Sequence, residues 1–414
     1  MSEPPSVTPT PPEPTLRSLV LTVYAPTLLF AVGQGAVVPV IALTADDLGA
    51  SAAVAGAAVA VRGLGTLAFD IPAGRLIERF GERRAMAIGT GILVVALAGC
   101  LLSPNVWVFL ASIFVLGCGW AMWLLARLTY VSEVMPFHRR GRALSTLGGV
   151  NRIGNFLGPF VGAGAIVWLD LAGAYWVHIV LACAGLLVLV GARDPHRPSV
   201  APTEHAPPPV ARIVSEHRRV FLTAGVGAMC LSVLRVSRHA IIPLWGNHIG
   251  LSPEAISVIF GISSAMDMTL FYPAGMISDR FGRKAIAVPC LTTLALGFLL
   301  IPLTSTFWAL TAAALVMGFG NGIGSGIVMT LGADFSPATG RASFLGVWRL
   351  VSDTGQAGGP LLAAAVIAVA GIGPAAVSVG ALGMAGAAVF VVAVPEPLHR
   401  ARAAAASTEP LDDP

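Results

Sequence analysis

The sequence has few charged residues for its length: they make up 11% of 414 residues, whereas hydrophobic residues make up 56%. Soluble domains carry about 25% charged residues, which cover their surface in water. This shortage excludes a water-soluble enzyme, a disordered chain and a nucleic-acid-binding protein. The sequence is that of a protein whose surroundings are mostly lipid.

Cysteine is scarce as well, and the five cysteines are scattered singly. Neither a CxxC pair nor a His cluster accompanies them, and each lies in an apolar stretch, as small buried side chains do. We therefore expect no disulfide framework, no metal site and no cofactor. The sequence also lacks HExxH, GxSxG and P-loop motifs, which argues against an enzyme.

Long apolar stretches, by contrast, recur along the whole chain. A bilayer core about 30 Å thick needs about 20 apolar residues per helix. Twelve stretches reach this length, which predicts an all-α membrane protein with twelve transmembrane helices. The predicted spans are 18–43, 53–76, 85–103, 106–134, 143–168, 173–192, 220–246, 254–277, 285–303, 306–331, 342–369 and 372–394.

Proline-rich polar segments divide these spans. Residues 1–16 contain many prolines and no signal-peptide pattern, so we expect a disordered tail there. A similar segment, 193–217, separates the spans six and six, which predicts a linker between two domains. The predicted domains are six-helix bundles over 17–192 and 218–395, followed by a second tail over 396–414.

Lysine and arginine mark one side of the membrane. Most of the 25 lie in the tails or in loops after helices 2, 4, 6, 8 and 10, and none lies in the loops of the other side. Those loops carry Asp46, Asp47, Asp170 and Glu254 instead. The positive-inside rule then predicts cytoplasmic termini and linker, in a multi-pass protein of the plasma or inner membrane. The net charge of +4 is therefore a topology signal, and we expect no nucleic-acid partner.

The two halves repeat each other at a constant offset of 201 residues. From residue 72 the chain reads PAGRLIERFGERR, and from residue 273 it reads PAGMISDRFGRK. Parallel six-helix repeats are typical of one large class of transporters. The repeated motif supplies a first set of candidate residues, namely Gly74, Glu78, Arg79, Gly81, Arg83, Arg84, Gly275, Asp279, Arg280, Gly282, Arg283 and Lys284.

This motif resembles the signature G-x-x-x-D-R-x-G-R-R of the major facilitator superfamily, found in the loop between helices 2 and 3. The second copy matches closely, whereas the first has Glu78 for Asp and Glu82 for the first Arg. The resemblance implies the major facilitator fold, two pseudo-symmetric six-helix bundles, and a monomer is expected. In the motif, the acidic residue would cap a helix or pair with arginine, and the glycines would let helices approach.

The fifth span carries a second motif, formed by Gly154, Gly158, Pro159 and Gly162. It resembles the G-x-x-x-G-P-x-x-G-G signature of the twelve-helix drug/proton antiporters, with Ala163 in the last position. Span 11 has nearly the same pattern, so plain helix packing explains it as well. The antiporters' helix-4 pattern R-x-x-Q-G-x-G is absent here, because Ile113 stands where it requires arginine.

Charged residues inside the spans are the main candidates for function, because each costs about 2.5–3.5 kcal/mol to insert. Asp70 and Arg349 lie at a similar depth, as do Arg152 and Asp267. In the fold that the sequence resembles, helices 2 and 11 face each other, as do helices 5 and 8. We therefore predict two pseudo-symmetric ion pairs between the halves, Asp70–Arg349 and Arg152–Asp267. The alternative is that each residue is satisfied within its own half.

Two further roles are assigned within the spans. Asp267 and Asp353 are the candidates for carrying a proton, with Arg62 as a possible partner of Asp353. Arginines exceed acids six to three in the spans, which favours an anionic or zwitterionic substrate. The candidates for lining the substrate cavity are Gln34, Arg127, Arg235, Arg238, His239, Asn321 and Gln356.

The sequence thus predicts a secondary transporter that works by alternating access, with protons as the coupling ion and the bilayer as its surroundings. Export of a small organic molecule or drug is the first interpretation. A proton-coupled importer or facilitator of an anionic metabolite is the alternative within the class. A non-transporting membrane receptor is the alternative from another class.

Overall fold

The fold is described from a computed structural model, in which residue 16 and residues 19–192, 210–337 and 340–396 are placed. Most of the predicted tails, 1–16 and 396–414, and the first part of the predicted linker, 193–209, lie outside the described residues. The second part of the linker is not an extended segment, because Val210–Glu216 form helix α8.

The described chain is almost entirely helical. The first half comprises η2 Val20–Tyr24, α1 Ala25–Val37, η3 Val38–Val40, α2 Ile41–Asp47, α3 Ala52–Phe80, α4 Glu82–Leu101, α5 Val106–Val134, α6 Phe137–Leu169 and α7 Ala172–Gly191. The second half comprises α8, α9 Arg218–Val220, η4 Phe221–Gly225, α10 Val226–His248, α11 Pro253–Phe281, α12 Lys284–Leu300, η5 Ile301–Leu303, α13 Phe307–Ile323, α14 Ile327–Phe335, α15 Arg341–Ala370 and α16 Ile372–Ala393.

Eleven of the helical segments in the described residues are long and apolar enough to cross a membrane. The remaining predicted span, 342–369, coincides with α15, which has 30 residues but is not among the eleven. Its first 20 residues, 341–360, include Arg349, Asp353, Gln356 and Pro360, which dilute the apolar character of the helix. The protein is therefore a multi-pass membrane protein.

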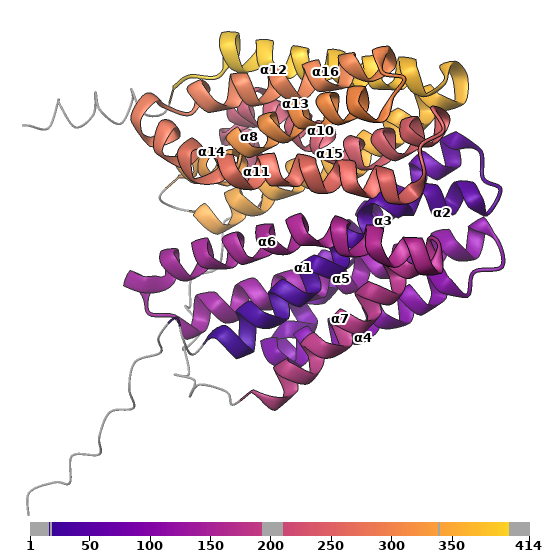
Figure 1. The fold of residues 1–414 in the computed structure, drawn as a ribbon. Helices are drawn as coiled ribbons and strands as arrows, with labels where there is room; N and C mark the ends of the chain where they lie inside the picture. Colours follow the sequence, from indigo (N-terminus) through magenta and orange to yellow (C-terminus); the bar gives the residue numbers. More distant parts are fainter. Residues whose placement is uncertain (1–15, 17–18, 193–209, 338–339, 397–414) are drawn as a thin grey trace, which may run out of the picture.

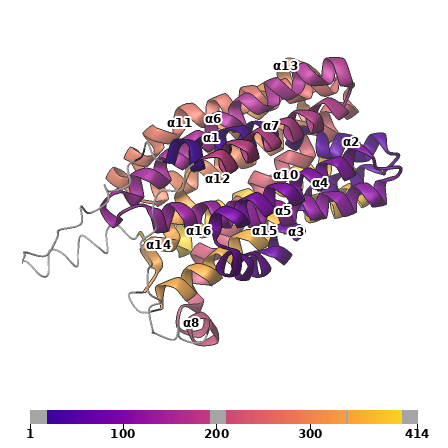
Figure 2. The ribbon, with the colours of Figure 1, turned by 90° about the horizontal axis from the view of Figure 1, so that it is seen from below.

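The long helices run roughly alongside one another in two groups (Figure 1). Helices α1 to α7 lie together on one side, and α10 to α16 lie together on the other. Figures 1 and 2 both show α8 and α14 at one end of the molecule and α2 at the other. We call the first the basic end, because Arg79–Arg84 and Arg280–Lys284 lie there, and the second the acidic end, which carries Asp46 and Asp47.

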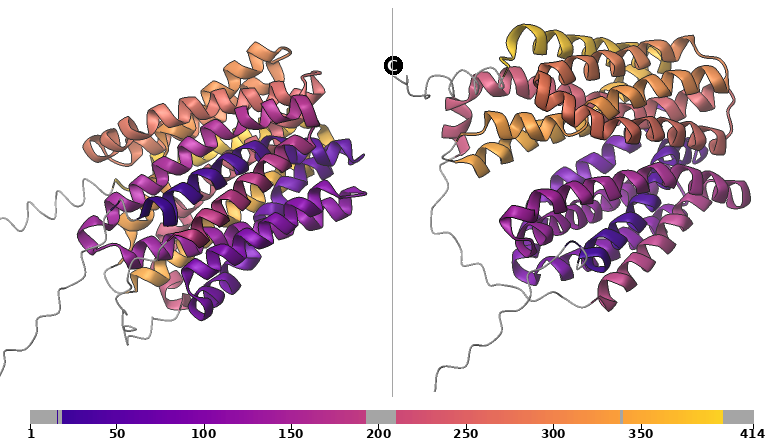
Figure 3. Two further views of the ribbon diagram at one scale, coloured as in Figure 1. Left: turned by 60° about the horizontal axis from the view of Figure 1, so that its bottom comes forward. Right: turned by 60° about the vertical axis from the view of Figure 1, so that its left-hand side comes forward.

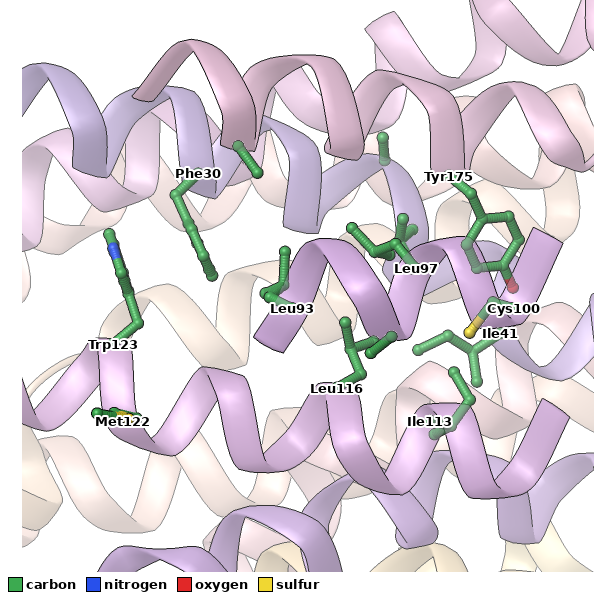
Figure 4. Close-up of a cluster of buried hydrophobic side chains, with 14 of the residues drawn as sticks. Phe30, Ile41, Leu93, Leu97, Cys100, Ile113, Leu116, Met122, Trp123 and Tyr175 are labelled. Atoms are coloured by element: carbon green, nitrogen blue, oxygen red, sulfur yellow. The ribbon is translucent and has the colours of Figure 1, made fainter. Parts of the chain in front are cut away.

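Each group of helices has its own apolar core. In the first group, side chains of α4, α5 and α7 meet those of α1 and α2, as the close-up in Figure 4 shows. Phe30 stacks on Trp123 with ring centroids 3.9 Å apart. Tyr175, which is 1% exposed, donates a hydrogen bond to Thr44 across 2.9 Å. Burying the polar tip of Tyr175 together with a partner avoids the cost of an unsatisfied hydroxyl.

The glycine motif of the fifth span packs α6 against α1. A Cβ atom on Gly158 would lie 2.4 Å from the Val32 carbonyl oxygen, and one on Gly154 would lie 2.4 Å from the Ala31 Cβ. In the second half, Gly359 approaches the Val233 carbonyl oxygen of α10 in the same way. The structure therefore gives both glycine patterns a packing role, as small residues have in membrane helices.

Candidate functional site

The two halves meet where α6 packs on α11 and where α3 packs on α15. On the first of these seams, Arg152 Nη1 lies 3.0 Å from Asp267 Oδ1. Arg152 also donates to Ser325 Oγ, and its guanidinium lies 4.4 Å from the centre of the Phe271 ring. Asp267 accepts a second hydrogen bond, of 2.7 Å, from Asn321 Nδ2. The Asp267 carboxylate is thus held by two donors, one from each half.

On the second seam, a single arginine lies between two acids. Arg349 Nη2 lies 3.5 Å from Asp70 Oδ1 of α3, and Arg349 Nε lies 3.2 Å from Asp353 Oδ2 on its own helix. Gln356 Nε2 donates to the other oxygen of Asp353 across 2.5 Å. Asp70 is held less firmly, because its Oδ1 is buried without a hydrogen bond from the described residues. Two carboxylates share one guanidinium here, so one acid is in excess.

The structure therefore brings together both predicted pairs of side chains, but they are not strict repeats of each other. At the 201-residue offset, Asp70 corresponds to Phe271 and Arg152 corresponds to Asp353. The Asp70–Arg349 contact lies one helical turn, about 6 Å, closer to the basic end than the Arg152–Asp267 contact. Asp353 pairs with Arg349 and not with Arg62, which was its possible partner.

Two of the remaining cavity candidates lie beside Asp267. Asn321 binds it directly, and Arg235 on α10 donates from Nη2 to the Gly324 carbonyl oxygen, 2.7 Å away. That carbonyl lies at a break in the helix within the predicted span 306–331: the segment Phe307–Phe335 is long and apolar enough to cross a membrane, but its helix stops at Ile323 and restarts at Ile327. The intervening Gly324-Ser325-Gly326 includes a glycine with φ +77°, a conformation that glycine adopts at little cost.

The other candidates are buried polar groups with few contacts. Gln34 Oε1, Arg238 Nε and His239 Nδ1 are buried and have no hydrogen-bond partner in the part of the chain that the structure describes. Arg127, 5% exposed, lies deep in the first half, with its guanidinium 4.2 Å from the centre of the Trp123 ring. Its Nη1 is 3.5 Å from Thr27 Oγ1. Both of these contacts are with residues of the first half, so Arg127 does not take part in the cluster around Asp267.

Towards the acidic end, the two halves touch closely along both seams. An ideal Cβ on Gly63 of α3 would lie 3.3 Å from Ala357 Cα of α15. On the other seam, one on Gly261 of α11 would lie 2.6 Å from the Phe160 ring of α6. Contact between the halves therefore extends from the acidic end as far as the charged groups.

Past the charged groups, towards the basic end, the same helices separate. An ideal Cβ on Gly74 of α3 would meet only Leu125 of its own half, at 4.0 Å, among the described residues. One on Gly346, which lies level with Gly74 on α15, would meet nothing within 4 Å in the same part of the chain. On the other seam, a Cβ on Gly148 of α6 or on Gly275 of α11 would likewise meet nothing within 4 Å in the described residues. Figure 1 and the right-hand view of Figure 3 show the two groups of ribbons diverging in this direction. The structure is thus closed at the acidic end and parted at the basic end.

A contact between repeat-related residues closes the acidic end. Asn247 Nδ2 of α10 donates to Asp46 Oδ2 of α2 across 2.8 Å, and the two positions are 201 residues apart. One turn deeper lie Leu43 and Leu244, which are also related by the repeat. Leu43 packs in the core of the second half, and Leu244 packs in the core of the first. This exchange resembles the contact of a two-fold symmetric dimer.

The repeated motif at the basic end anchors the last helix of each half. The Arg83 guanidinium donates to the Leu189 and Val190 carbonyl oxygens at the end of α7. Lys284 Nζ donates to the Val391 carbonyl oxygen of α16, 3.0 Å away. Because 83 and 284, like 190 and 391, are 201 apart, this contact repeats in both halves. Such cations satisfy carbonyls that a helix end leaves unpaired.

Other motif predictions need correction. Most of the motif is helical and not a loop, since α3 runs to Phe80 and α11 to Phe281. Gly81 and Gly282 end these helices with φ of +80° and +97°. Gly74 and Gly275 allow no close helix approach in this conformation, and Glu78 is exposed. Arg79, Arg84 and Arg280 are also exposed, Arg283 pairs with Asp334 at 2.7 Å, and the Asp279 side chain lies outside what is described.

Several partners in this site were missed by the sequence analysis. Ser325 and Phe271, which contact Arg152, are a small and an apolar residue inside predicted spans and carry no charge signal. Asn247 could have been found by applying the 201-residue offset to Asp46. Among the described residues, no three His, Cys, Asp or Glu side chains gather into a group that could hold a metal ion.

Comparison with known families and proteins gives one consistent result. The model of the Major Facilitator Superfamily matches residues 26–240 and 239–412. The multidrug resistance protein MdtH of Klebsiella pneumoniae is 25% identical over 333 residues, which cover 78% of this chain and 80% of that protein. MdtH of Edwardsiella ictaluri is 27% identical over the same shares.

Solved structures share the fold at low sequence identity. A crystal structure of a D-xylose–proton symporter superposes with a TM-score of 0.72 at 18% identity, covering 92% of this chain and 98% of that one. A POT family transporter in complex with a thioalcohol-conjugated peptide gives a TM-score of 0.76 at 12% identity, covering 91% and 96%. At these identities the likeness shows the fold alone.

Proposed function

The chain belongs to the major facilitator superfamily, and from this premise we propose that it is a proton-coupled exporter of a small organic molecule, with twelve spans. It is a membrane transporter and not an enzyme. The proposed arrangement has bundles over 17–192 and 218–395, joined by the 193–217 linker. The clustering of Lys and Arg at the basic end supports placing that end in the cytoplasm of a plasma or inner membrane.

Alternating access is supported by the way the halves meet. They touch from the acidic end to the charged groups and are parted beyond them at Gly74 and Gly346. Rocking about the charged layer would close the basic end and break the Asp46–Asn247 hydrogen bond. The site would then open to the other side, which is how transporters with paired repeats work. In these terms, the structure represents the cytoplasm-facing state.

The single observation that carries proton coupling is the sharing of Arg349 by Asp70 and Asp353. One guanidinium can neutralise one carboxylate, and the second then repels its neighbour unless it takes up a proton. A proton gained or lost by this pair changes the charge on the seam that must open and close. We assign proton transfer to this pair, of which Asp353 was a candidate from sequence. Asp267 is the less suitable carrier, because among the described residues it shares its arginine, Arg152, with no second carboxylate.

Export is supported by the relatives, since the two MdtH proteins are named multidrug resistance proteins and are matched over 80% of their length. The glycine motif of α6 does not distinguish export from import, because its repeat-related copy packs α15 on α10 in the same way. The excess of arginine in the spans favours the alternative, a proton-coupled importer or facilitator of an anionic metabolite.

The test is flux in proteoliposomes with an imposed pH gradient, measured across a panel of cationic and anionic organic compounds. We expect at least one compound to move against its own gradient when protons move the other way, and to stop when an ionophore collapses the pH gradient. Empty liposomes are the control. Indifference of every compound to the gradient would contradict proton coupling. Movement of cargo in the same direction as protons would replace export by import.

A further inference from the structure

The break between α13 and α14 is a site of concentrated positive charge. It lies in the interior of a predicted span, where Arg235 binds the Gly324 carbonyl and Arg152 binds Ser325. Helix α14 starts at Ile327, directly after the break. The first N–H groups of a helix carry a partial positive charge and attract anions. The arginines and this helix end therefore act in the same sense.

Counting charges shows that the site has more cations than its acid can neutralise. Arg152, Arg235 and Arg238 all interact electrostatically around Asp267. Asp267 is committed to Arg152 and Asn321. Arg238 makes no hydrogen bond or ion pair with the described residues, and the Nε atoms of Arg235 and Arg238 are both buried without a partner. A surplus of about two positive charges in a membrane span is costly unless an anion offsets it.

We propose that this site binds a carboxylate group of the transported molecule, so that the cargo is an organic anion or a zwitterion. Guanidinium groups suit carboxylates because they offer paired donors in one plane. A single negative charge also costs less to desolvate than a doubly charged phosphate. Arg238 and Arg235 are the residues that contact the cargo, and Arg152, held by Asp267 and Ser325, positions the site. The inference rests on the proposed function and names its substrate class.

The test uses two xanthene dyes with the same ring skeleton and opposite charge, fluorescein and rhodamine 123. Their binding to the purified full-length protein is measured by fluorescence polarisation at a fixed pH. We expect fluorescein to bind more tightly than rhodamine 123. Arg238→Gln and Arg235→Gln should each weaken fluorescein binding by about tenfold, the effect of losing one charged hydrogen bond. Neither should weaken rhodamine 123 binding.

Matched variants separate recognition from folding. Arg238→Lys keeps the charge and should retain most of the fluorescein affinity. Arg212→Gln removes a positive charge from the exposed helix α8 and should change nothing. The proposal is overturned if rhodamine 123 binds as tightly as fluorescein, if neither dye binds, or if Arg238→Gln binds fluorescein like the wild type. The wild-type comparison decides the matter even if an arginine variant fails to fold.

The same dyes distinguish this inference from the proposed function. Gradient-driven transport of rhodamine 123 without fluorescein would overturn the anionic cargo and leave proton-coupled transport standing. Gradient-driven transport of fluorescein that is lost in Arg238→Gln would support both. Binding of fluorescein without any gradient-driven flux of a panel compound would support the site and contradict proton coupling.

Discussion

A cross-link between cysteines at positions 46 and 247 is expected to reduce transport to the level of empty vesicles. Asp46 and Asn247 are hydrogen-bonded across 2.8 Å at the acidic end, where the two halves meet. In the proposed cycle this contact must break each time the acidic end opens. A covalent bridge therefore traps the state seen here. The measurement is gradient-driven flux in proteoliposomes before and after a short bifunctional thiol reagent.

Few of the native cysteines are accessible to the thiol reagent, so they interfere little with this experiment. Of the five, all within the described residues, four are buried and Cys183 is half-buried, so Cys183→Ser removes the accessible thiol. Asp46→Cys and Asn247→Cys alone, treated with the same reagent, should keep their flux, because one thiol cannot bridge the halves. A reducible reagent should let the flux of the double variant recover. Full transport by a cross-linked protein would show that the acidic end does not open.

Asp70→Asn and Asp353→Asn are each expected to abolish gradient-driven accumulation while cargo exchange without a gradient continues. Asp70→Asn keeps the ion pair of Arg349 with Asp353 on the same helix, and Asp353→Asn keeps its ion pair with Asp70 across the seam. Either change removes the carboxylate in excess. Without the second carboxylate, the net charge of this group no longer changes when a proton is available. Flux with and without an imposed pH gradient, in the same vesicles, measures the difference.

Asp267→Asn is the matched comparison, because it removes an acid at the neighbouring seam. It leaves Arg152, Arg235 and Arg238 without their counter-ion. We therefore expect lower stability of the folded protein or altered cargo binding, and not a selective loss of proton coupling. Arg349→Gln leaves two acids unpaired and should cost about 3–5 kcal/mol in the state that buries them. Loss of coupling in Asp267→Asn alone, with Asp70→Asn and Asp353→Asn still coupled, would contradict the assignment.

Much of the fold was predictable because membrane helices leave strong local signals. Apolar length located the spans, and the 201-residue repeat related the halves. The helical rise counted from the charges at the basic end placed Asp70 level with Arg349, and Arg152 nearly level with Asp267. Depth along a helix can be read from a sequence in this way, because each residue contributes a fixed rise.

Rotation about a helix axis and local breaks are harder to predict. The pairing of Arg349 with Asp353 as well as Asp70 depends on which face of α15 meets α3, and tertiary packing sets that face. The break at Gly324-Ser325-Gly326 reads as a continuous apolar stretch, since glycine is common in membrane helices. Asn247 is an uncharged residue that attracts no notice by itself, and only the 201-residue offset from Asp46 would have pointed to it.

The central claim is that the two halves rock about the charged layer, so that one end closes as the other opens. The most direct measurement uses two pairs of spin labels in separate samples, at Gly74 and Gly346 on the basic end and at Asp46 and Asn247 on the acidic end. Pulsed dipolar spectroscopy gives the distances in each pair at different pH values. The account predicts two distances for each pair. When the population with the short basic-end distance rises, the population with the long acidic-end distance should rise with it. A single distance in both pairs, or distances that lengthen together, would contradict it.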